Sequence, residues 1–135
     1  MLVYAYNGQR GSGKTTILQK LSSAITSRWH TFGRVERFEN GKVLTVKDNG
    51  RYVGICPDCR TVEVVTELFK KAEELSFDVL VVEGDRDDVA NAIKAEVSKH
   101  KSWHYKSGLK EPRRPVLPYS QDLADVQTIM DEIGI

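Results

Sequence analysis

The sequence is poor in cysteine and in long apolar runs, and each shortage excludes a class of protein. The two cysteines among 135 residues, Cys56 and Cys59, are too few and too close together for the disulfide framework of a small secreted domain. We expect reduced thiols. The longest aliphatic run, Val79 to Val82, is far too short to span a bilayer, and the N-terminus lacks the regions of a signal peptide. We therefore expect a cytoplasmic protein with no membrane partner.

A strong excess of one charge is also missing. The formal net charge is +1, so no global attraction to nucleic acid or to a membrane surface is expected, and any such attraction has to be local. The length is close to that of one ordinary domain, and the chain contains no internal repeat, linker or low-complexity tract. We expect a single domain over residues 1–135, which holds the whole function.

A glycine-rich loop lies between a predicted strand and a predicted helix. Leu2–Tyr6 is a short apolar run typical of a buried parallel strand, and Lys14–Arg28 carries apolar residues at helical spacing. Between them, the spacing Gly-x-x-x-x-Gly-Lys-Thr is met in full by Gly8, Gly13, Lys14 and Thr15. At average residue frequencies this pattern arises by chance in roughly one chain of this length in 200. Chance is therefore a poor explanation.

Each part of the loop has a physical task. The glycines allow successive backbone N–H groups to turn around an anion, and the following helix directs its positive dipole end at the same phosphates. Lys14 would reach the β and γ phosphates, and the Thr15 hydroxyl would ligate magnesium. At these residues the chain resembles the P-loop NTPase superfamily. The resemblance implies binding of ATP or another nucleoside triphosphate with Mg²⁺ by the loop and its flank: Gly8, Gln9, Arg10, Gly11, Ser12, Gly13, Lys14, Thr15 and Thr16.

The rest of the chain alternates strands with helices. Asn40-Gly41 and Asn49-Gly50 supply the positive φ angles of hairpin turns, so we expect an antiparallel meander whose last strand joins the central sheet. The predicted elements after the first helix are strands at 34–39, 42–47 and 51–56, a helix at 62–75, a buried strand at 77–84, a helix at 87–99, an irregular basic stretch, a short strand at Val116-Leu117, and a last helix N-capped by Ser120 and ended by Gly134. This pattern predicts an α/β fold, and with the resemblance a three-layer α/β/α sandwich of P-loop NTPase type with a mostly parallel sheet.

An acidic residue at the end of a neighbouring buried strand would complete a magnesium site. Glu83, with Asp85 just beyond it, follows the aliphatic run Val79–Val82, and strand ends in open α/β sheets face the ligand crevice. The ending Val-Val-Glu-Gly is similar to that of small P-loop proteins such as uridine kinases and the ATPase accessory family of molybdopterin dinucleotide synthesis. The alternative is Asp58, after the strand ending at Cys56. Its competing interpretation is a helix N-cap, and no Asn-Lys-x-Asp guanine-reading motif supports a GTPase switch.

Two further groups of residues carry alternatives. Cys56-Pro57-Asp58-Cys59 resembles a redox dithiol, or the cysteines join His100 and His104 in a zinc site, or they are ordinary strand-end cysteines. Residues 94–114 are strongly basic and include Lys101, Lys106 and three aromatic or histidine side chains in a row. They predict a mobile lid whose Arg113 and Arg114 approach the transferring phosphate, a surface for single-stranded nucleic acid, or simply a solvated face.

These observations favour a small phosphotransferase, similar to a nucleoside, nucleotide or small-molecule kinase. In this hypothesis Lys14 stabilises the transferring phosphoryl group, Arg113 or Arg114 completes the charge clamp, and Asp85 or Asp87 activates an acceptor hydroxyl. Two alternatives stay open. One is an ATP hydrolase that acts with a protein or nucleic-acid partner, and the other is a nucleotide-binding accessory protein with little turnover. The acceptor, the partner and the base preference do not follow from the sequence.

Overall fold

The computed structural model describes residues 1–9, 11–29, 32–84, 86–112 and 118–135. Arg10, Asp85, Arg113, Arg114 and the predicted strand at Val116-Leu117 lie outside the described residues. The elements in chain order are β1 (Leu2–Asn7), α1 (Lys14–Trp29), β2 (Arg34–Phe38), β3 (Gly41–Asp48), β4 (Arg51–Cys56), α2 (Val62–Leu75), β5 (Val79–Gly84), α3 (Asp87–Ser98), β6 (His104–Leu109) and α4 (Pro118–Glu132). None of the described helices has the length and apolar character needed to cross a membrane.

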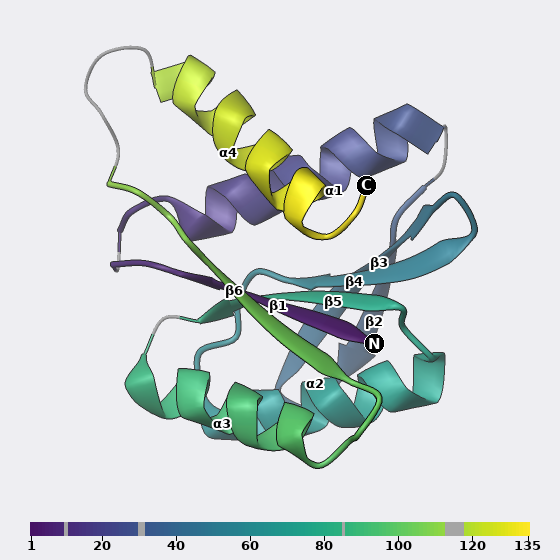
Figure 1. Cartoon of the computed structure of the whole chain (residues 1–135). Helices are drawn as coiled ribbons and strands as arrows, with labels where there is room; N and C mark the ends of the chain where they lie inside the picture. Colours follow the sequence, from purple (N-terminus) through teal and green to yellow (C-terminus); the bar gives the residue numbers. More distant parts are fainter. Residues whose placement is uncertain (10, 30–31, 85, 113–117) are drawn as a thin grey trace.

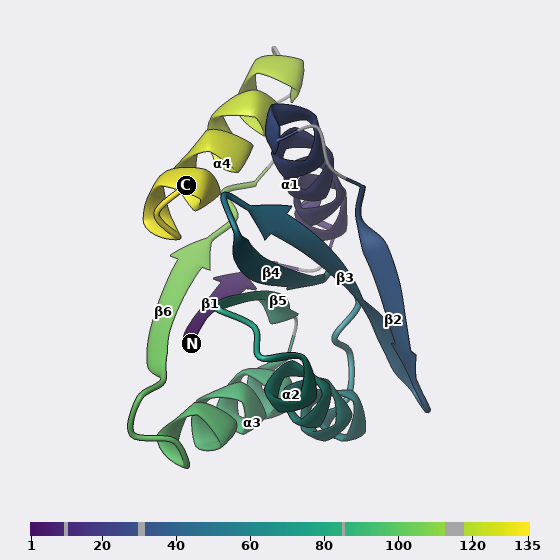
Figure 2. The same cartoon turned by 90° about the vertical axis from the view of Figure 1, so that its right-hand side faces the viewer.

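The strands form one mixed sheet in the order β2-β3-β4-β5-β1-β6. β4, β5, β1 and β6 run parallel, and β2, β3 and β4 are joined by antiparallel pairing. Figure 2 shows β2 and β6 at opposite edges of the sheet. The predicted α/β class and the predicted meander, with its last strand paired to the central part of the sheet, are confirmed.

Helices cover both faces of this sheet. α1 and α4 lie on one side, and α2 and α3 lie on the other (Figure 1). The side chains of β1 alternate between the two faces of the sheet. Val3 and Ala5 belong to the apolar cluster that contains α2 and α3, whereas Tyr4 and Tyr6 belong to the cluster that contains α1 and α4. β5 is buried along its whole length, which explains its continuous aliphatic sequence.

Two sequence-based predictions in the last third of the chain are wrong. The basic stretch is not irregular throughout, because His104–Leu109 forms β6, an edge strand parallel to β1. Its side chains are largely exposed, so it carries no apolar run, and backbone pairing with β1 rather than burial defines it. Ser120 is not an N-cap, because α4 already begins at Pro118. Proline is favoured in the first turn of a helix, where its missing N–H has no intrahelical partner.

Gly54 marks the tightest contact between β4 and the segment that leads into β5. A Cβ atom added there would lie 2.4 Å from Cε2 of Phe77, and Phe77 is buried in the cluster of α2 and α3. The ring therefore occupies the space that any other residue at this position needs for its side chain.

We predict that Gly54→Ala lowers the free energy of unfolding by about 1–3 kcal/mol, because the added methyl group overpacks the core. Urea denaturation of four proteins measures it: wild type, Gly54→Ala, Phe77→Leu and the double variant. The loss caused by Gly54→Ala should be smaller in the Phe77→Leu background, where the ring is gone. Equal losses in the two backgrounds would contradict the contact.

Candidate functional site

The carboxyl ends of the neighbouring strands β1 and β5 lie side by side, at the end of the sheet where both strands enter their loops. The two strands pair in parallel, with Tyr6 opposite Glu83 and Asn7 opposite Gly84. β1 leads into the glycine-rich loop of residues 8–15, and α1 begins within that loop at Lys14. The predicted loop and the predicted acid Glu83 are therefore brought together, although they lie far apart in the sequence.

The glycine-rich loop adopts backbone conformations that favour glycine. Gly11 and Gly13 have φ angles of 81° and 97°, which strain any residue with a Cβ atom. A Cβ atom added at Gly11 would have no neighbour within 4 Å, so the loop is open on this side. The N-terminus of α1, where helices in general have N–H groups without intrahelical partners, follows directly. The glycine-rich loop is thus open at Gly11 and leads into the positive end of a helix dipole.

Lys14 is folded back over the loop. Its side chain donates from Nζ to the carbonyl oxygens of Gly8 at 2.8 Å and Gln9 at 2.9 Å, and the residue is only 2% exposed. The Ser12 hydroxyl oxygen is buried and has no hydrogen-bond partner among the described residues. Buried polar atoms are rarely left without a partner. Ser12 is thus an acceptor or donor available to a bound group.

Thr15 connects the loop to β5. Its hydroxyl donates to Oε2 of Glu83 at 2.8 Å, and its oxygen also lies 3.4 Å from the carbonyl oxygen of Pro57. Glu83 is 9% exposed. The loop, the end of β5 and the segment after β4 therefore converge on one hydroxyl group.

Asp58 does not have the N-cap role that competed with metal binding. Thr61 caps α2, because its side chain accepts from the Val64 backbone N–H at 3.2 Å. The Asp58 side chain is 61% exposed and forms an ion pair with Arg60 at 2.5 Å. A threonine caps a helix through its side-chain oxygen as an aspartate does. Asp58 remains near the loop through its neighbour Pro57.

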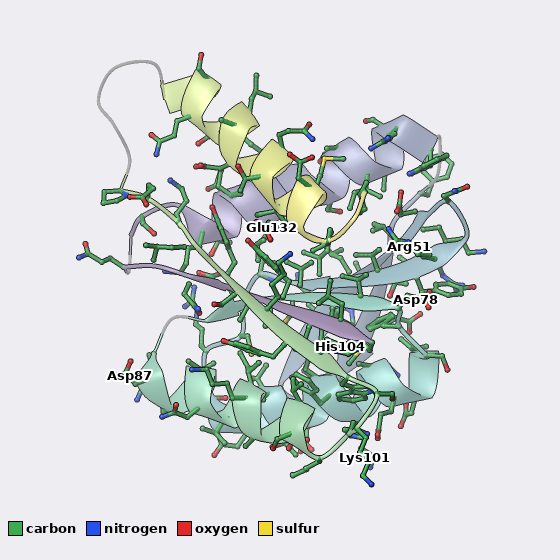
Figure 3. The ribbon with its side chains drawn as sticks, viewed as in Figure 1. Arg51, Asp78, Asp87, Lys101, His104 and Glu132 are labelled. Atoms are coloured by element: carbon green, nitrogen blue, oxygen red, sulfur yellow. The ribbon has the colours of Figure 1, made fainter. Side chains whose placement is uncertain are left out.

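Of the two acids that follow β5 and were predicted to act at the site, the structure describes only Asp87. Asp85 is outside the described residues, and Asp87 is exposed in the first turn of α3. Figure 3 shows Asp87 at the end of the molecule where β1 and β5 enter their loops. Negative charge is favourable at this helix start, because it complements the positive end of the dipole. That placement alone explains Asp87 without a catalytic role.

The two cysteines belong to the core. Each is 1% exposed, and both lie in the cluster of α2 and α3. A hydrogen bond from the Cys59 thiol lowers the pKa of Cys56, although burial opposes this shift. The same hydrogen bond, together with burial, raises the pKa of Cys59. Buried thiols are generally unreactive, so the structure favours strand-end cysteines over a redox dithiol.

The zinc hypothesis is wrong. Cys56 lies opposite Val82 near the carboxyl end of the parallel strands, whereas His104 pairs with Leu2 at their start, as the position of His104 in Figure 3 shows. His100 stacks on Trp103 with ring centroids 3.6 Å apart. In the described part of the chain, no group of three or more His, Cys, Asp and Glu side chains is placed to hold a metal ion.

Several cations of the basic stretch have partners. Lys106 pairs with Glu132 at 2.5 Å, and Lys99 pairs with Glu96 at 3.1 Å. Lys110 is buried, so it is part of neither a lid nor a solvated face. Lys101 is exposed at the end of the molecule distant from the glycine-rich loop (Figure 3). The stretch is therefore less available to an acidic ligand than its sequence suggests.

Sequence reasoning missed two residues at the site. Oδ1 of Asn7 is buried without a hydrogen-bond partner among the described residues, at the point where β1 enters the loop. Lys110 follows β6 and packs against Gly8. Asn7 could have been found from the sequence, because a polar residue at the carboxyl end of a buried strand indicates a position facing the ligand crevice. Lys110 could not, because its place at the site depends on the pairing of β6 with β1.

Comparison with protein-family models, with curated proteins and with solved structures finds no match to this chain. Its function therefore has to be inferred from its own residues.

We predict that Cys59→Ala raises the pKa of Cys56, because the hydrogen bond that lowers it is lost and burial then dominates. The pH dependence of the Cβ carbon chemical shift of Cys56 measures it, because the shift follows ionisation of the thiol even though Cys56 is buried. Cys59→Ser is the matched control, since a hydroxyl still donates. The transition of Cys56 should occur at higher pH in Cys59→Ala than in Cys59→Ser. Identical profiles in the two variants would refute the hydrogen bond as the cause.

Proposed function

We propose that this protein is a P-loop NTPase of the three-layer α/β/α type that binds ATP or another nucleoside triphosphate with Mg²⁺. One observation carries the proposal: Lys14 is ordered over the loop, and Thr15 donates to Glu83 at 2.8 Å. A lysine is the residue type that binds phosphates in such a loop, and a hydroxyl with a carboxylate is the pair that binds magnesium. All three side chains lie where β1 and β5 end.

The loop residues fit a triphosphate. The backbone amides of the open loop and the α1 N-terminus would donate to phosphate oxygens, and the unpartnered Ser12 hydroxyl would join them. Lys14 would exchange the carbonyl oxygens of Gly8 and Gln9 for phosphate oxygens. That exchange replaces neutral acceptors by anionic ones, which form stronger, charge-assisted hydrogen bonds.

Thr15 and Glu83 fit magnesium. Mg²⁺ prefers oxygen ligands and is commonly held by only one or two carboxylates besides phosphates and water. Bound there, it would neutralise charge on the phosphates. The Thr15 oxygen has lone pairs available while its proton is donated to Glu83, so the existing hydrogen bond would orient the hydroxyl for this ion. Asp85 is proposed as a second acid from its sequence position alone.

A cavity at the same end of the sheet suits a phosphoryl acceptor. It has a volume of about 330 Å³ and is lined by the β2–β3 turn and the segment after β4, namely Arg37, Phe38, Glu39, Asn40, Gly41, Lys42 and Asp58. Asp58 follows Pro57, whose carbonyl oxygen lies 3.4 Å from the Thr15 hydroxyl oxygen. The lining offers an aromatic ring and both signs of charge. We therefore propose a phosphotransferase whose acceptor is a small polar molecule.

The exposed apolar residues favour a second candidate, a nucleotide-dependent accessory protein with little turnover. Phe32 is 94% exposed and Val35, on the edge strand β2, is 47% exposed. Exposed apolar side chains beside an unpaired strand edge are typical of a protein contact. An ATP hydrolase stimulated by nucleic acid has weaker support, because Lys106 is already paired with Glu132.

We predict that Lys14→Ala weakens the binding of Mg-ATP at least about 100-fold, because it removes a cation that would make charge-assisted hydrogen bonds to two phosphates. Isothermal titration of ATP and GTP, each with Mg²⁺, measures it and gives the base preference. Lys47→Ala is the control, since Lys47 is exposed on β3. Failure of the wild-type protein to bind any triphosphate would end the proposal.

We predict that Asp58→Asn raises the KM for the acceptor about tenfold and leaves ATP affinity unchanged, because one charged hydrogen-bonding group of the cavity is neutralised. A screen of nucleosides, nucleotides and sugars for stimulated ADP formation identifies the acceptor first. Asp87→Asn tests the alternative that Asp87 of α3 activates the acceptor hydroxyl. If that alternative holds, Asp87→Asn lowers kcat, whereas Asp58→Asn mainly raises KM. Tight nucleotide binding with no stimulation by any acceptor would favour the accessory protein.

A further inference from the structure

Lys110 is a lysine whose side chain is 0% exposed. A buried ammonium group is costly unless it is paired and hydrogen-bonded. Nζ of Lys110 lies 3.1 Å from Oδ2 of Asp125 and donates to the Glu111 carbonyl oxygen at 2.6 Å. The pair joins the end of β6 to α4. Nothing in the predicted chemistry of the site uses it.

The backbone of Lys110 supports the start of the glycine-rich loop. Its N–H donates to the carbonyl oxygen of Asn7, the last residue of β1, at 2.7 Å, which continues the β1–β6 pairing one residue past β6. A Cβ atom added at Gly8 would lie 3.0 Å from the carbonyl oxygen of Lys110 and 3.1 Å from its Cβ. Gly8 is thus packed directly on Lys110. The Gly8 carbonyl oxygen also accepts a hydrogen bond from Nζ of Lys14 at 2.8 Å.

α4 has two kinds of attachment to the rest of the protein. Its apolar side chains pack into the cluster that also contains α1: Val126, Ile129 and Met130, with Ile133 just beyond the helix. Asp122 adds an ion pair with Lys20 of α1 at 2.6 Å. These contacts reach α1, beside which α4 lies in Figures 1 and 2, and Glu132 adds an ion pair with Lys106 of β6 at 2.5 Å. The Lys110–Asp125 pair differs, because it connects α4 to the residue on which the glycine-rich loop rests.

We propose that Lys110 and Asp125 are positioning residues that couple the docking of α4 to the conformation of the glycine-rich loop. The proposal rests on the proposed nucleotide binding. Contacts run without a gap from Asp125 through Lys110 to Gly8, and from Gly8 to Lys14. Because the Lys110 side chain is fully buried, it would act through Gly8 and not on a phosphate. By linkage, a docked α4 strengthens nucleotide binding, and bound nucleotide stabilises α4 against opening.

The test compares Asp125→Asn with Asp131→Asn, an exposed aspartate on the same helix. Mg-ATP affinity is measured by isothermal titration, and amide hydrogen exchange of residues 118–132 is measured with and without Mg-ATP. We expect wild type and Asp131→Asn to bind alike and to gain protection in α4 with ATP. Asp125→Asn should bind about tenfold more weakly and lose most of that gain. Asp125→Glu, which keeps the charge, should recover a large part of both.

Two outcomes would overturn the inference in different ways. If the wild-type protein binds no nucleotide, the proposed function fails and the coupling fails with it. If the wild type binds, but Asp125→Asn is only less stable in urea, with unchanged ATP affinity and unchanged protection of α4 by ATP, the ion pair is purely structural. In that case the proposed function stands and the positioning role is rejected. If Asp125→Asn does not fold, the double variant Lys110→Met, Asp125→Leu decides, because it replaces the ion pair by apolar side chains without leaving a buried charge unpaired. Weakened ATP binding and lost protection of α4 in the folded double variant would support the positioning role, and normal values of both would reject it.

Discussion

The parallel pairing of β1 with β5 is the constraint on which the rest of the structure depends. It runs in register from Leu2 opposite Val79 to Asn7 opposite Gly84, and each of the two strands has a further neighbour on its other side, β4 beside β5 and β6 beside β1. Because parallel strands point the same way, the glycine-rich loop and Glu83 emerge at one edge. The pairing is close at that edge: a Cβ atom at Gly84 would lie 2.4 Å from Oδ1 of Asn7. A glycine there lets the two strand ends approach.

Much of this arrangement could be predicted from the sequence, because the signals are local and strong. The aliphatic run of β5 indicates a strand buried on both faces, and the Asn-Gly pairs define the turns of the meander. Apolar residues at helical spacing predict α1 and α2. The convergence of Thr15 and Glu83 then follows from one rule, that carboxyl ends of parallel strands share an edge. The structure agrees with this rule, because the two side chains form a hydrogen bond of 2.8 Å.

The remainder could not be predicted, because it depends on contacts between distant segments. The side chains of β6 are largely exposed, and only its pairing with β1 makes it a strand. Its one lysine, Lys106, is a residue type that discourages an edge strand from pairing with other chains. The burial of Lys110 depends in turn on that pairing and on α4. Asp58 and Thr61 are equivalent caps by residue type, so only the position where α2 begins separates them. Local patterns identify elements, whereas tertiary contacts decide which charges are paired.

In the proposed function, the position of Lys14 means that folding arranges the site before the nucleotide binds. An exposed lysine loses much side-chain freedom when it binds a phosphate, but Lys14 is already buried and held by the Gly8 and Gln9 carbonyl oxygens. Thr15 is likewise oriented by Glu83. Groups fixed in advance need little reorganisation when charge is placed between them. Different contacts hold the two residues. Lys14 is bonded to Gly8, which packs against Lys110, whereas Thr15 is bonded to Glu83 of β5. In the proposed function, affinity for a triphosphate would therefore depend on both groups of contacts, and a change in either should alter the binding of the ligand.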